Sequence, residues 1–221
     1  YFTAKSIFDS LILMSFFFRF FEVILCFKKI SSIWVSLGLC LWKLICSDFT
    51  NEDFLSPIKT IVGSTPIHIL INNSGYLKHL PFAEITPQVY NKTMDINFKA
   101  PFFLIQSLLP NLISAKAHIV NIGSMGGFQG SAKFNGLAAY SASKAALHIL
   151  TECLAQELVD DKISVNCLAL GSAQTEMLEK AFPGYQSPVA AFEMGKYIAD
   201  FALTGNRFFN GKTLPVAMVT P

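Results

Sequence analysis

Two residues spaced one helical turn apart give the strongest indication of chemistry in this sequence. Tyr140 and Lys144 form the pattern Tyr-x-x-x-Lys, and a spacing of four places both side chains on one face of a helix. A free tyrosine has a pKa of about 10, and a fixed cation beside it favours the phenolate and lowers that pKa. The pattern therefore predicts a group that donates and accepts a proton near neutral pH. Taken alone, the same spacing also occurs on solvated helix faces.

Further polar residues follow short apolar segments of the chain. Ser124 follows residues 117–122 in Asn-Ile-Gly-Ser-Met-Gly-Gly, and Asn-Asn-Ser-Gly (72–75) ends the apolar segment 68–72. Asn97 lies in the helix-length stretch after that segment. In open α/β sheets, ligands bind at the carboxyl ends of the strands. We therefore expect the Ser124 hydroxyl to lie where it can meet a substrate carbonyl.

The elements that must position these residues alternate between two kinds. Short, continuously apolar segments suit strands buried on both faces of a parallel sheet; they comprise residues 68–72, 117–122, 162–170 and 213–219, with 21–27 and 44–47 as earlier strands. Helix-length stretches lie between them, and they comprise residues 86–97, 100–115, 138–159 and 187–203. Thr86-Pro87 and Ser187-Pro188 are typical helix starts. The order predicts one α/β domain over residues 1–221, a doubly wound parallel sheet between two layers of helices.

In this order, the motifs resemble those of the short-chain dehydrogenase/reductase family, 3-oxoacyl-ACP reductases among them, from about residue 46 to 221. Residues 72–75 are similar to the family's N-N-A-G turn, with Ser74 in place of alanine. Tyr140 and Lys144 match its Y-x-x-x-K pair, Ser124 its catalytic serine and Asn97 its helix asparagine. Residues 166–171 resemble N-x-x-x-P-G, with Leu170 in place of proline, and Asn210-Gly211 fits before the last strand.

The resemblance implies a Rossmann-type three-layer fold and hydride transfer between NADP(H), or NAD(H), and a carbonyl or alcohol. Tyr140 would act as general acid and base, and Lys144 would lower the pKa of Tyr140 and bind the nicotinamide ribose. Ser124 would bind the substrate oxygen, and Asn97 would hold a water in the proton path. The cofactor-binding residues would be Asn72, Ser74, Gly75, Tyr140, Lys144, Gly171, Thr175, Asp48, Lys28 and Lys29.

Lys28-Lys29, just after the segment 21–27, would meet a 2′-phosphate and favour NADP, although a solvated turn explains this pair equally well. Asp48 matches the family's acidic residue beside the adenine; an aspartate there is also a common cap at the end of a strand. Ser124 and Tyr140 are 16 residues apart, which is longer than usual in the family, and residues 130–136 are the natural place for the extra length.

The family's first strand and its T-G-x-x-x-G-x-G loop have no clear counterpart. Such glycines let the backbone approach a pyrophosphate at a helix N-terminus, yet Gly38 is the sole glycine among the first sixty residues. Residues 3–8 (Thr-Ala-Lys-Ser-Ile-Phe) resemble a degraded remnant of the loop. A truncated or mis-assembled N-terminus, weak cofactor binding and a non-catalytic relative all fit this pattern.

The composition favours a globular domain and gives no support for a nucleic-acid-binding or metal-binding protein. Apolar residues make up 52% and charged residues 14% of 221, which is enough for a sizeable core. The net charge of +2 gives no reason to expect nucleic acid as a partner. Five scattered cysteines predict buried free thiols and no metal site. Residues 11–27 and 30–46 are apolar but short and interrupted by charges, so buried segments are favoured over membrane spans.

The leading hypothesis is a cytoplasmic, NADP-preferring carbonyl reductase or alcohol dehydrogenase that acts on a small apolar carbonyl or alcohol. Residues 172–186 form the expected substrate loop, with Met177, Leu178, Phe182 and Tyr185 as apolar members. The resemblance implies a homodimer or homotetramer paired through the helices at 100–115 and 138–159. The alternatives are a non-catalytic structural or regulatory relative and an enzyme anchored to a membrane by residues 11–46.

Overall fold

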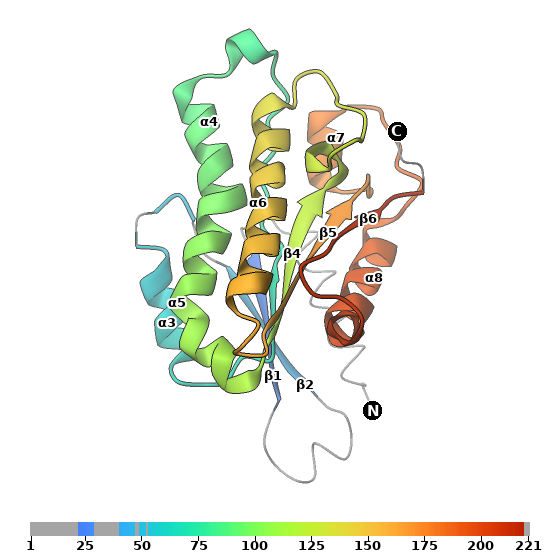
Figure 1. Cartoon of the computed structure of the whole chain (residues 1–221). Coiled ribbons are helices and arrows are strands. Elements are labelled where there is room, and N and C mark those ends of the chain that lie inside the picture. The colour runs from blue at the N-terminus through green and yellow to red at the C-terminus, as the bar shows by residue number, and fades with distance from the viewer. Residues whose placement is uncertain (1–21, 29–39, 47–48, 52, 219–221) are drawn as a thin grey trace.

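A computed structural model describes residues 22–28, 40–46, 49–51 and 53–218 of the chain (Figure 1). A single six-stranded sheet forms the centre of this part, in the order β2-β1-β3-β4-β5-β6. The strands are β1 (Glu22–Lys28), β2 (Cys40–Cys46), β3 (Ile69–Asn72), β4 (His118–Ser124), β5 (Ser164–Leu170) and β6 (Thr213–Val216). Strands β3 to β6 run parallel to one another. The described structure thus has the predicted α/β architecture.

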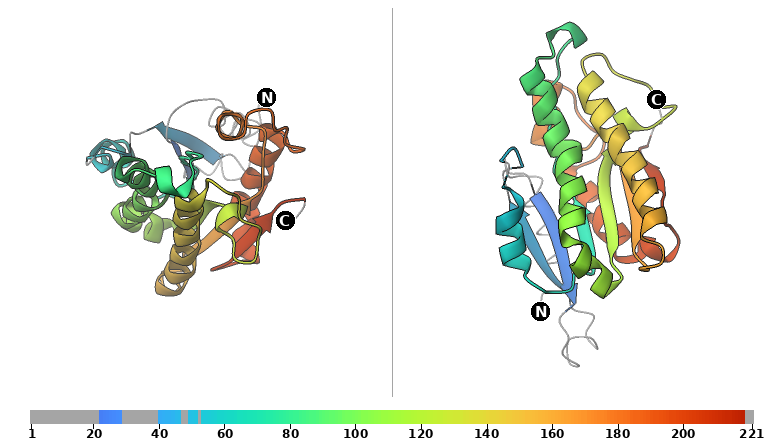
Figure 2. Two further views of the ribbon diagram at one scale, coloured as in Figure 1. Left: turned by 90° about the horizontal axis from the view of Figure 1, so that it is seen from above. Right: turned by 60° about the vertical axis from the view of Figure 1, so that its left-hand side comes forward.

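Helices cover both faces of this sheet (Figures 1 and 2). They are α3 (Leu55–Val62), α4 (Pro87–Met94), α5 (Ala100–Ala115), α6 (Ala138–Glu157), α7 (Glu176–Ala181) and α8 (Ala191–Thr204). Leu70 packs in a core cluster with residues of α3 and α5, whereas Ile69 and Ile71 pack in a second cluster with residues of α8. Alternate side chains of β3 therefore face opposite layers, which explains why the strand is apolar throughout.

Most predicted helices are confirmed, with shifts at their ends. The Thr86 hydroxyl accepts a hydrogen bond from the Val89 backbone and Pro87 opens α4, as expected. The π-helical turn η2 (Asp95–Lys99) joins α4 directly to α5. Helix α8 begins at Ala191, not after Ser187-Pro188, because Glu193 Oε2 accepts from the Ala190 backbone and caps the helix there. Helices α3 and α7 have too few turns to show a clear pattern in the sequence.

The N-terminal strands do not run as predicted. Strand β1 pairs antiparallel with both β2 and β3, so the sheet is mixed and not wholly parallel. A parallel crossover needs a dozen or more residues and usually a helix, whereas eleven residues separate Lys28 from Cys40. Because β1 is antiparallel to both β2 and β3, β2 runs in the same direction as β3. Its carboxyl end, Cys46, lies at the same edge of the sheet as Asn72.

Two other expectations concern membranes and cysteines. Within the described ranges, every helix is too short or too polar to cross a bilayer. The apolar segments 11–27 and 30–46 fall largely outside these ranges, and their described parts are strands β1 and β2. Cys167 is a buried free thiol as predicted, but Cys153 is exposed, which corrects the expectation that both would be buried.

Candidate active site

The carboxyl end of β4 and the first turn of α6 bring Ser124 and Tyr140 together. The Ser124 side chain is hydrogen-bonded to the Tyr140 phenol, and Ser124 Oγ also accepts from the Gly126 backbone at 3.1 Å. A Cβ at Gly126 would lie 3.5 Å from Ser124 Oγ and 3.8 Å from Tyr140 Cε1. Gly126 thus has no side chain beside this hydrogen-bonded pair, which lies at the carboxyl end of β4.

The pKa of Tyr140 shifts in the direction opposite to the one that the sequence predicts. Burial raises the pKa of Tyr140 above its usual value, and the hydrogen bond from Ser124 opposes this only in part. The sequence predicts the opposite direction, because it places the Lys144 cation beside the phenol. In the structure, the shift is dominated by desolvation, which disfavours the phenolate. The Tyr140 phenol is therefore protonated at neutral pH.

Lys144 lies one turn further along α6, where it is 3% exposed. Its ammonium donates a hydrogen bond of 2.7 Å to the Ile122 carbonyl of β4. Burial lowers the pKa of Lys144 to about 8, with the nearby Cys167 acting in the other direction. A Cβ at Gly75 would lie 3.8 Å from Lys144 Nζ, so the ammonium lies close to the turn after β3. The Lys144 ammonium therefore loses its proton at a pH closer to neutral than an exposed lysine does.

Asn97 lies in η2, and its buried side chain joins three parts of the site. Its Oδ1 accepts from the Tyr76 backbone at 2.7 Å, and its Nδ2 donates to the Tyr76 carbonyl and to Ser143 Oγ, both at 2.9 Å. Both amide protons are thus used, and the side chain clamps the turn after Gly75 onto α6. The predicted role of Asn97 in binding a water stays a prediction.

Asn72, at the end of β3, begins a buried chain of hydrogen bonds. Asn72 Nδ2 donates to Asn121 Oδ1 at 2.7 Å, and Asn121 Nδ2 donates to Thr151 Oγ1 at 2.9 Å. This chain links β3, β4 and α6. Asn72 Oδ1 is buried without a hydrogen-bond partner among the described residues. A buried polar atom of this kind is a position where a bound ligand can donate.

The remaining predicted residues lie along the same edge. Ser74 is buried in the turn after β3. Gly171 follows β5, where its backbone donates to the Val216 carbonyl at 2.9 Å. The Thr175 hydroxyl accepts from the Leu178 backbone and caps α7. Met177 of α7 reaches back to the site, because a Cβ at Gly75 would lie 3.5 Å from its Cε. These residues thus lie in the segments that follow β3 and β5.

The described residues fit one half of a nicotinamide dinucleotide. The unpartnered Asn72 Oδ1, the Lys144 ammonium beside Gly75 and the Thr175 segment offer donors and acceptors for a nicotinamide and its ribose. A pyrophosphate needs a glycine-rich turn leading into a helix. Before β3, the described ranges contain the β1–β2 hairpin and α3, which follows Phe54 without a side-chain cap. No such cradle is present in these ranges.

The structure also contradicts the predicted position of Lys28. Because β1 is antiparallel to β3, with Cys26 opposite Ile69, Lys28 lies at the sheet edge opposite to Asn72, Tyr140 and Lys144. A contact between Lys28 and a cofactor bound at the site is therefore ruled out in this topology. Lys29, Asp48 and the glycine-loop remnant at residues 3–8 lie outside the described residues.

Two buried groups beneath the site were not singled out from the sequence. A Cβ at Gly123 would lie 2.4 Å from His148 Nε2 and 2.6 Å from Cys167 Sγ, so only glycine fits between them. Burial, together with the Lys144 charge, lowers the pKa of His148 to about 4, although a hydrogen bond to the Gly127 backbone opposes this. Burial raises the pKa of Cys167 to about 12. Nothing in the sequence separates these residues from ordinary core positions.

Comparison with known proteins shows which family the chain belongs to. The chain is 35% identical over 129 residues to an L-xylulose reductase of Caenorhabditis elegans; the match covers 58% of this chain and about half (49%) of that relative. It is 32% identical over 193 residues to the rhamnolipids biosynthesis 3-oxoacyl-[acyl-carrier-protein] reductase of Pseudomonas aeruginosa, over 79% of this chain and 75% of that protein.

A solved structure and a family model agree with these relatives. The Pseudomonas aeruginosa RhlG/NADP active-site complex superposes with a TM-score of 0.69 at 27% identity, over 84% of this chain and 78% of that one. The family model for short chain dehydrogenases matches residues 45–186, a range that holds Ser124, Tyr140 and Lys144. The chain therefore belongs to the short-chain dehydrogenase family and has its Rossmann-type fold.

Proposed function

We propose that this protein is an oxidoreductase that uses a nicotinamide dinucleotide to interconvert a carbonyl and an alcohol. The observation that carries the proposal is the hydrogen-bonded pair of Ser124 and Tyr140 at the carboxyl edge of the sheet, with Lys144 one turn away. The activity of a relative named as a reductase supports the reaction class. When bound, the dinucleotide supplies or accepts the hydride.

The residues of the chain account for the proton. A substrate carbonyl oxygen accepts hydrogen bonds from the Ser124 and Tyr140 hydroxyls. Because burial raises the pKa of Tyr140, the phenol is protonated and donates its proton as negative charge develops on that oxygen. The Lys144 ammonium then stabilises the phenolate that is left. In the reverse direction, Tyr140 takes the proton from the alcohol.

The test is the variant Tyr140→Phe, assayed for ketone reduction with both NADPH and NADH. Loss of the proton donor should lower kcat by about 10²- to 10⁴-fold, while the melting temperature stays within a few degrees. Tyr197→Phe, at an exposed position of α8, is the matched control. Unchanged turnover in Tyr140→Phe would refute the proposed role.

A second candidate is a non-catalytic relative that acts as a structural or regulatory partner. The missing phosphate cradle in the described ranges favours it. Titration with NADPH followed by fluorescence distinguishes the two, because the second candidate predicts no saturable binding.

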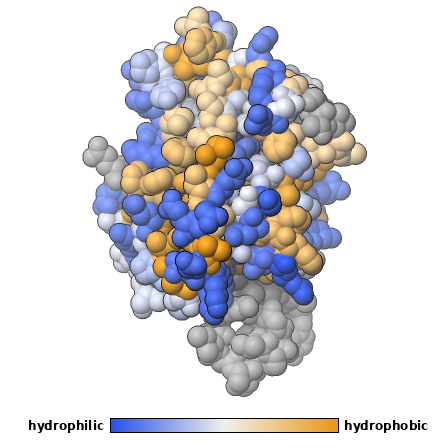
Figure 3. Space-filling view, in the orientation of Figure 1, coloured by the Kyte–Doolittle hydropathy of each residue, from blue (hydrophilic) through white to orange (hydrophobic). Residues whose placement is uncertain are grey.

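Self-association through α5 and α6 belongs to the same proposal. Phe102 and Phe103 on α5 and Ile149 on α6 are exposed hydrophobic side chains. Figure 3 shows hydrophobic atoms among hydrophilic ones on the face that these helices form. Large exposed apolar groups are typical of interfaces. Sedimentation of Phe102→Glu/Ile149→Glu beside the unchanged chain measures whether this face pairs two copies.

A further inference from the structure

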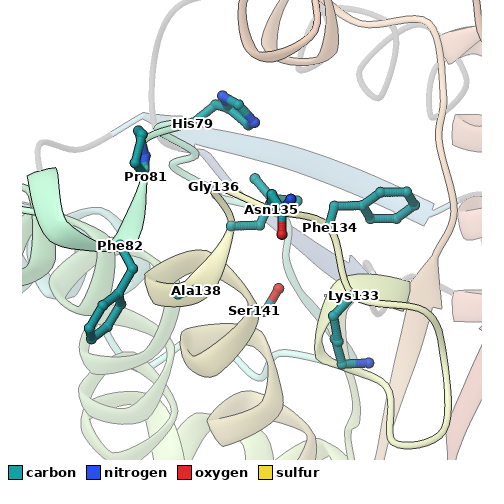
Figure 4. A pocket seen from close by; sticks show the side chains of 10 residues that line it. His79, Pro81, Phe82, Lys133, Phe134, Asn135, Gly136, Ala138 and Ser141 are labelled. Carbon is teal, nitrogen blue, oxygen red and sulfur yellow. The ribbon is translucent and has the colours of Figure 1, made fainter.

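A cavity of about 610 Å³ lies between the segment that follows β3 and the segment that precedes α6 (Figure 4). Its size falls within the range of small-molecule sites. Its walls come from His79, Pro81 and Phe82 on one side, and from residues 133–138 with Ser141 on the other. The second wall includes part of residues 130–136, where the sequence places the extra length of the Ser124–Tyr140 interval.

The two walls are fixed to each other. The Leu80 backbone donates to the Gly136 carbonyl at 3.0 Å. Gly136 has φ of +80°, and a Cβ there would lie 2.6 Å from His79 Nε2, so the imidazole rests directly against the backbone of the opposite wall. The His79 ring also packs edge-on against Phe182, with centroids 5.2 Å apart. The cavity is therefore formed before any ligand enters.

The lining is apolar in character despite one nearby cation. Lys133 Nζ donates to the Phe128 carbonyl, the Ser131 carbonyl and Ser131 Oγ, at 2.6–2.9 Å. All three ammonium protons are thus used within its own loop, so none is left for an anionic ligand. Phe82 and Phe134 stand at the rim, 81% and 53% exposed. Exposed aromatic rings offer apolar contact area to a ligand.

The cavity adjoins the catalytic pair. Ser141, which lines it, follows Tyr140 on α6. A Cβ at Gly126 would lie 3.1 Å from Ser141 Oγ and 3.5 Å from Ser124 Oγ. Ser124 and Tyr140 are not part of the lining itself, so a ligand whose oxygen meets them would reach the cavity by passing Ser141.

We infer that this cavity binds the larger, apolar substituent of the substrate carbonyl, and that the protein prefers ketones with an aryl or alkyl group over polyhydroxylated ketoses. The inference rests on the proposed function and adds the substrate class. A sugar chain would leave most of its hydroxyls without partners against this lining, which is unfavourable. A phenyl group would instead pack against Phe82 and Phe134.

The experiment compares three ketones: 2-butanone, 4-phenyl-2-butanone and a ketopentose. Binding is measured by saturation-transfer NMR titration without cofactor, and kcat/KM is measured with NADPH and with NADH. The phenyl group should tighten binding by about tenfold or more over 2-butanone, given the apolar area that it buries. The ketopentose should bind no better than 2-butanone.

Three variants test whether the preference for 4-phenyl-2-butanone arises in this cavity. Ala138→Phe fills the cavity at an exposed position of α6, and it should reduce the preference for 4-phenyl-2-butanone over 2-butanone at least tenfold. Phe134→Ala should reduce it about threefold. Phe208→Ala, at a ring 77% exposed outside the cavity, is the control and should keep the preference.

The outcomes separate the two proposals. Equal affinity for both ketones, or a preference that survives Ala138→Phe, overturns the cavity assignment even when both ketones are reduced. Tight binding of 4-phenyl-2-butanone that Ala138→Phe abolishes, without reduction of any ketone, supports the cavity and refutes the proposed function.

Discussion

The sheet has two halves that resemble each other in amino-acid composition but not in what they can position. In β3 to β6, four strands run in one direction, so their carboxyl ends place Asn72, Ser124 and Gly171 at one edge. In the β1–β2 hairpin the strands run in opposite directions, so their ends are divided between the two edges. Strand direction, not apolar character, therefore decides which half can form a site. Five predictions test the parallel half and the hairpin half in turn.

The largest effect is expected for Lys144→Met in the parallel half. Removing the ammonium should lower kcat/KM by about 10³-fold, comparable to the loss of a donor that stabilises developing charge. The free energy of unfolding should be equal to that of the wild type or higher. The Lys144 ammonium is buried, and its lowered pKa shows that the folded state disfavours the protonated form. Kinetics and urea denaturation of the same preparation measure both. A large fall in stability would contradict this account of Lys144.

The wild-type pH profile is a companion test. Since the pKa of Lys144 is about 8, kcat/KM should fall as the pH rises through about 8, where the ammonium loses its proton. A profile that stays flat to pH 10 would show that the charge is not needed.

Asn97→Ala tests the clamp that holds the turn after β3. The change leaves the part-buried Tyr76 backbone groups and the buried Ser143 hydroxyl without these partners, and it should lower the free energy of unfolding by about 3 kcal/mol. Asn91→Ala, at an exposed position of α4, is the control and should have almost no effect. Equal effects of the two variants in urea denaturation would contradict the clamp.

Acid stability tests the buried His148 beneath the site. Its pKa is lowered from 6.5 to about 4, so the folded state disfavours the protonated form. The free energy of unfolding is therefore highest above pH 6.5 and decreases as the pH falls towards 4. At pH 5, protonation of His148 in the unfolded state has lowered it by about 2 kcal/mol. His148→Leu should flatten the dependence of the unfolding free energy between pH 7 and 5. Ile149→Ala, at an exposed position of the same helix, changes no titratable group and should keep the wild-type dependence.

The smallest effect is expected in the hairpin half. Lys28→Ala should leave the KM for NADPH and for NADH within about twofold of wild type, because Lys28 lies at the opposite edge of the sheet. A rise in KM for NADPH alone would restore the role that the sequence assigns to it and would contradict the antiparallel placement of β1.

Much of the site could be predicted because its signals are local or follow directly from strands. Tyr140 and Lys144 are one turn apart in any helix, and Thr86-Pro87 caps a helix wherever it occurs. Ser124 and Asn72 follow apolar segments whose length and continuity indicate buried strands. The antiparallel direction of β1 could not be predicted from such signals, because an apolar strand shows the same residue pattern whichever way it runs in the sheet.

The sequence by itself determined the family, the parallel β3–β6 core and the residues that meet at its carboxyl edge. Only the tertiary structure decided that burial raises the pKa of Tyr140, that Lys144 donates to the Ile122 carbonyl and that Lys28 lies at the opposite edge of the sheet from the site. It also placed residues 79–82 beside residues 133–138 around one cavity. Desolvation, strand direction and contacts between distant segments depend on what surrounds a residue in space, and spacing along the chain does not encode that.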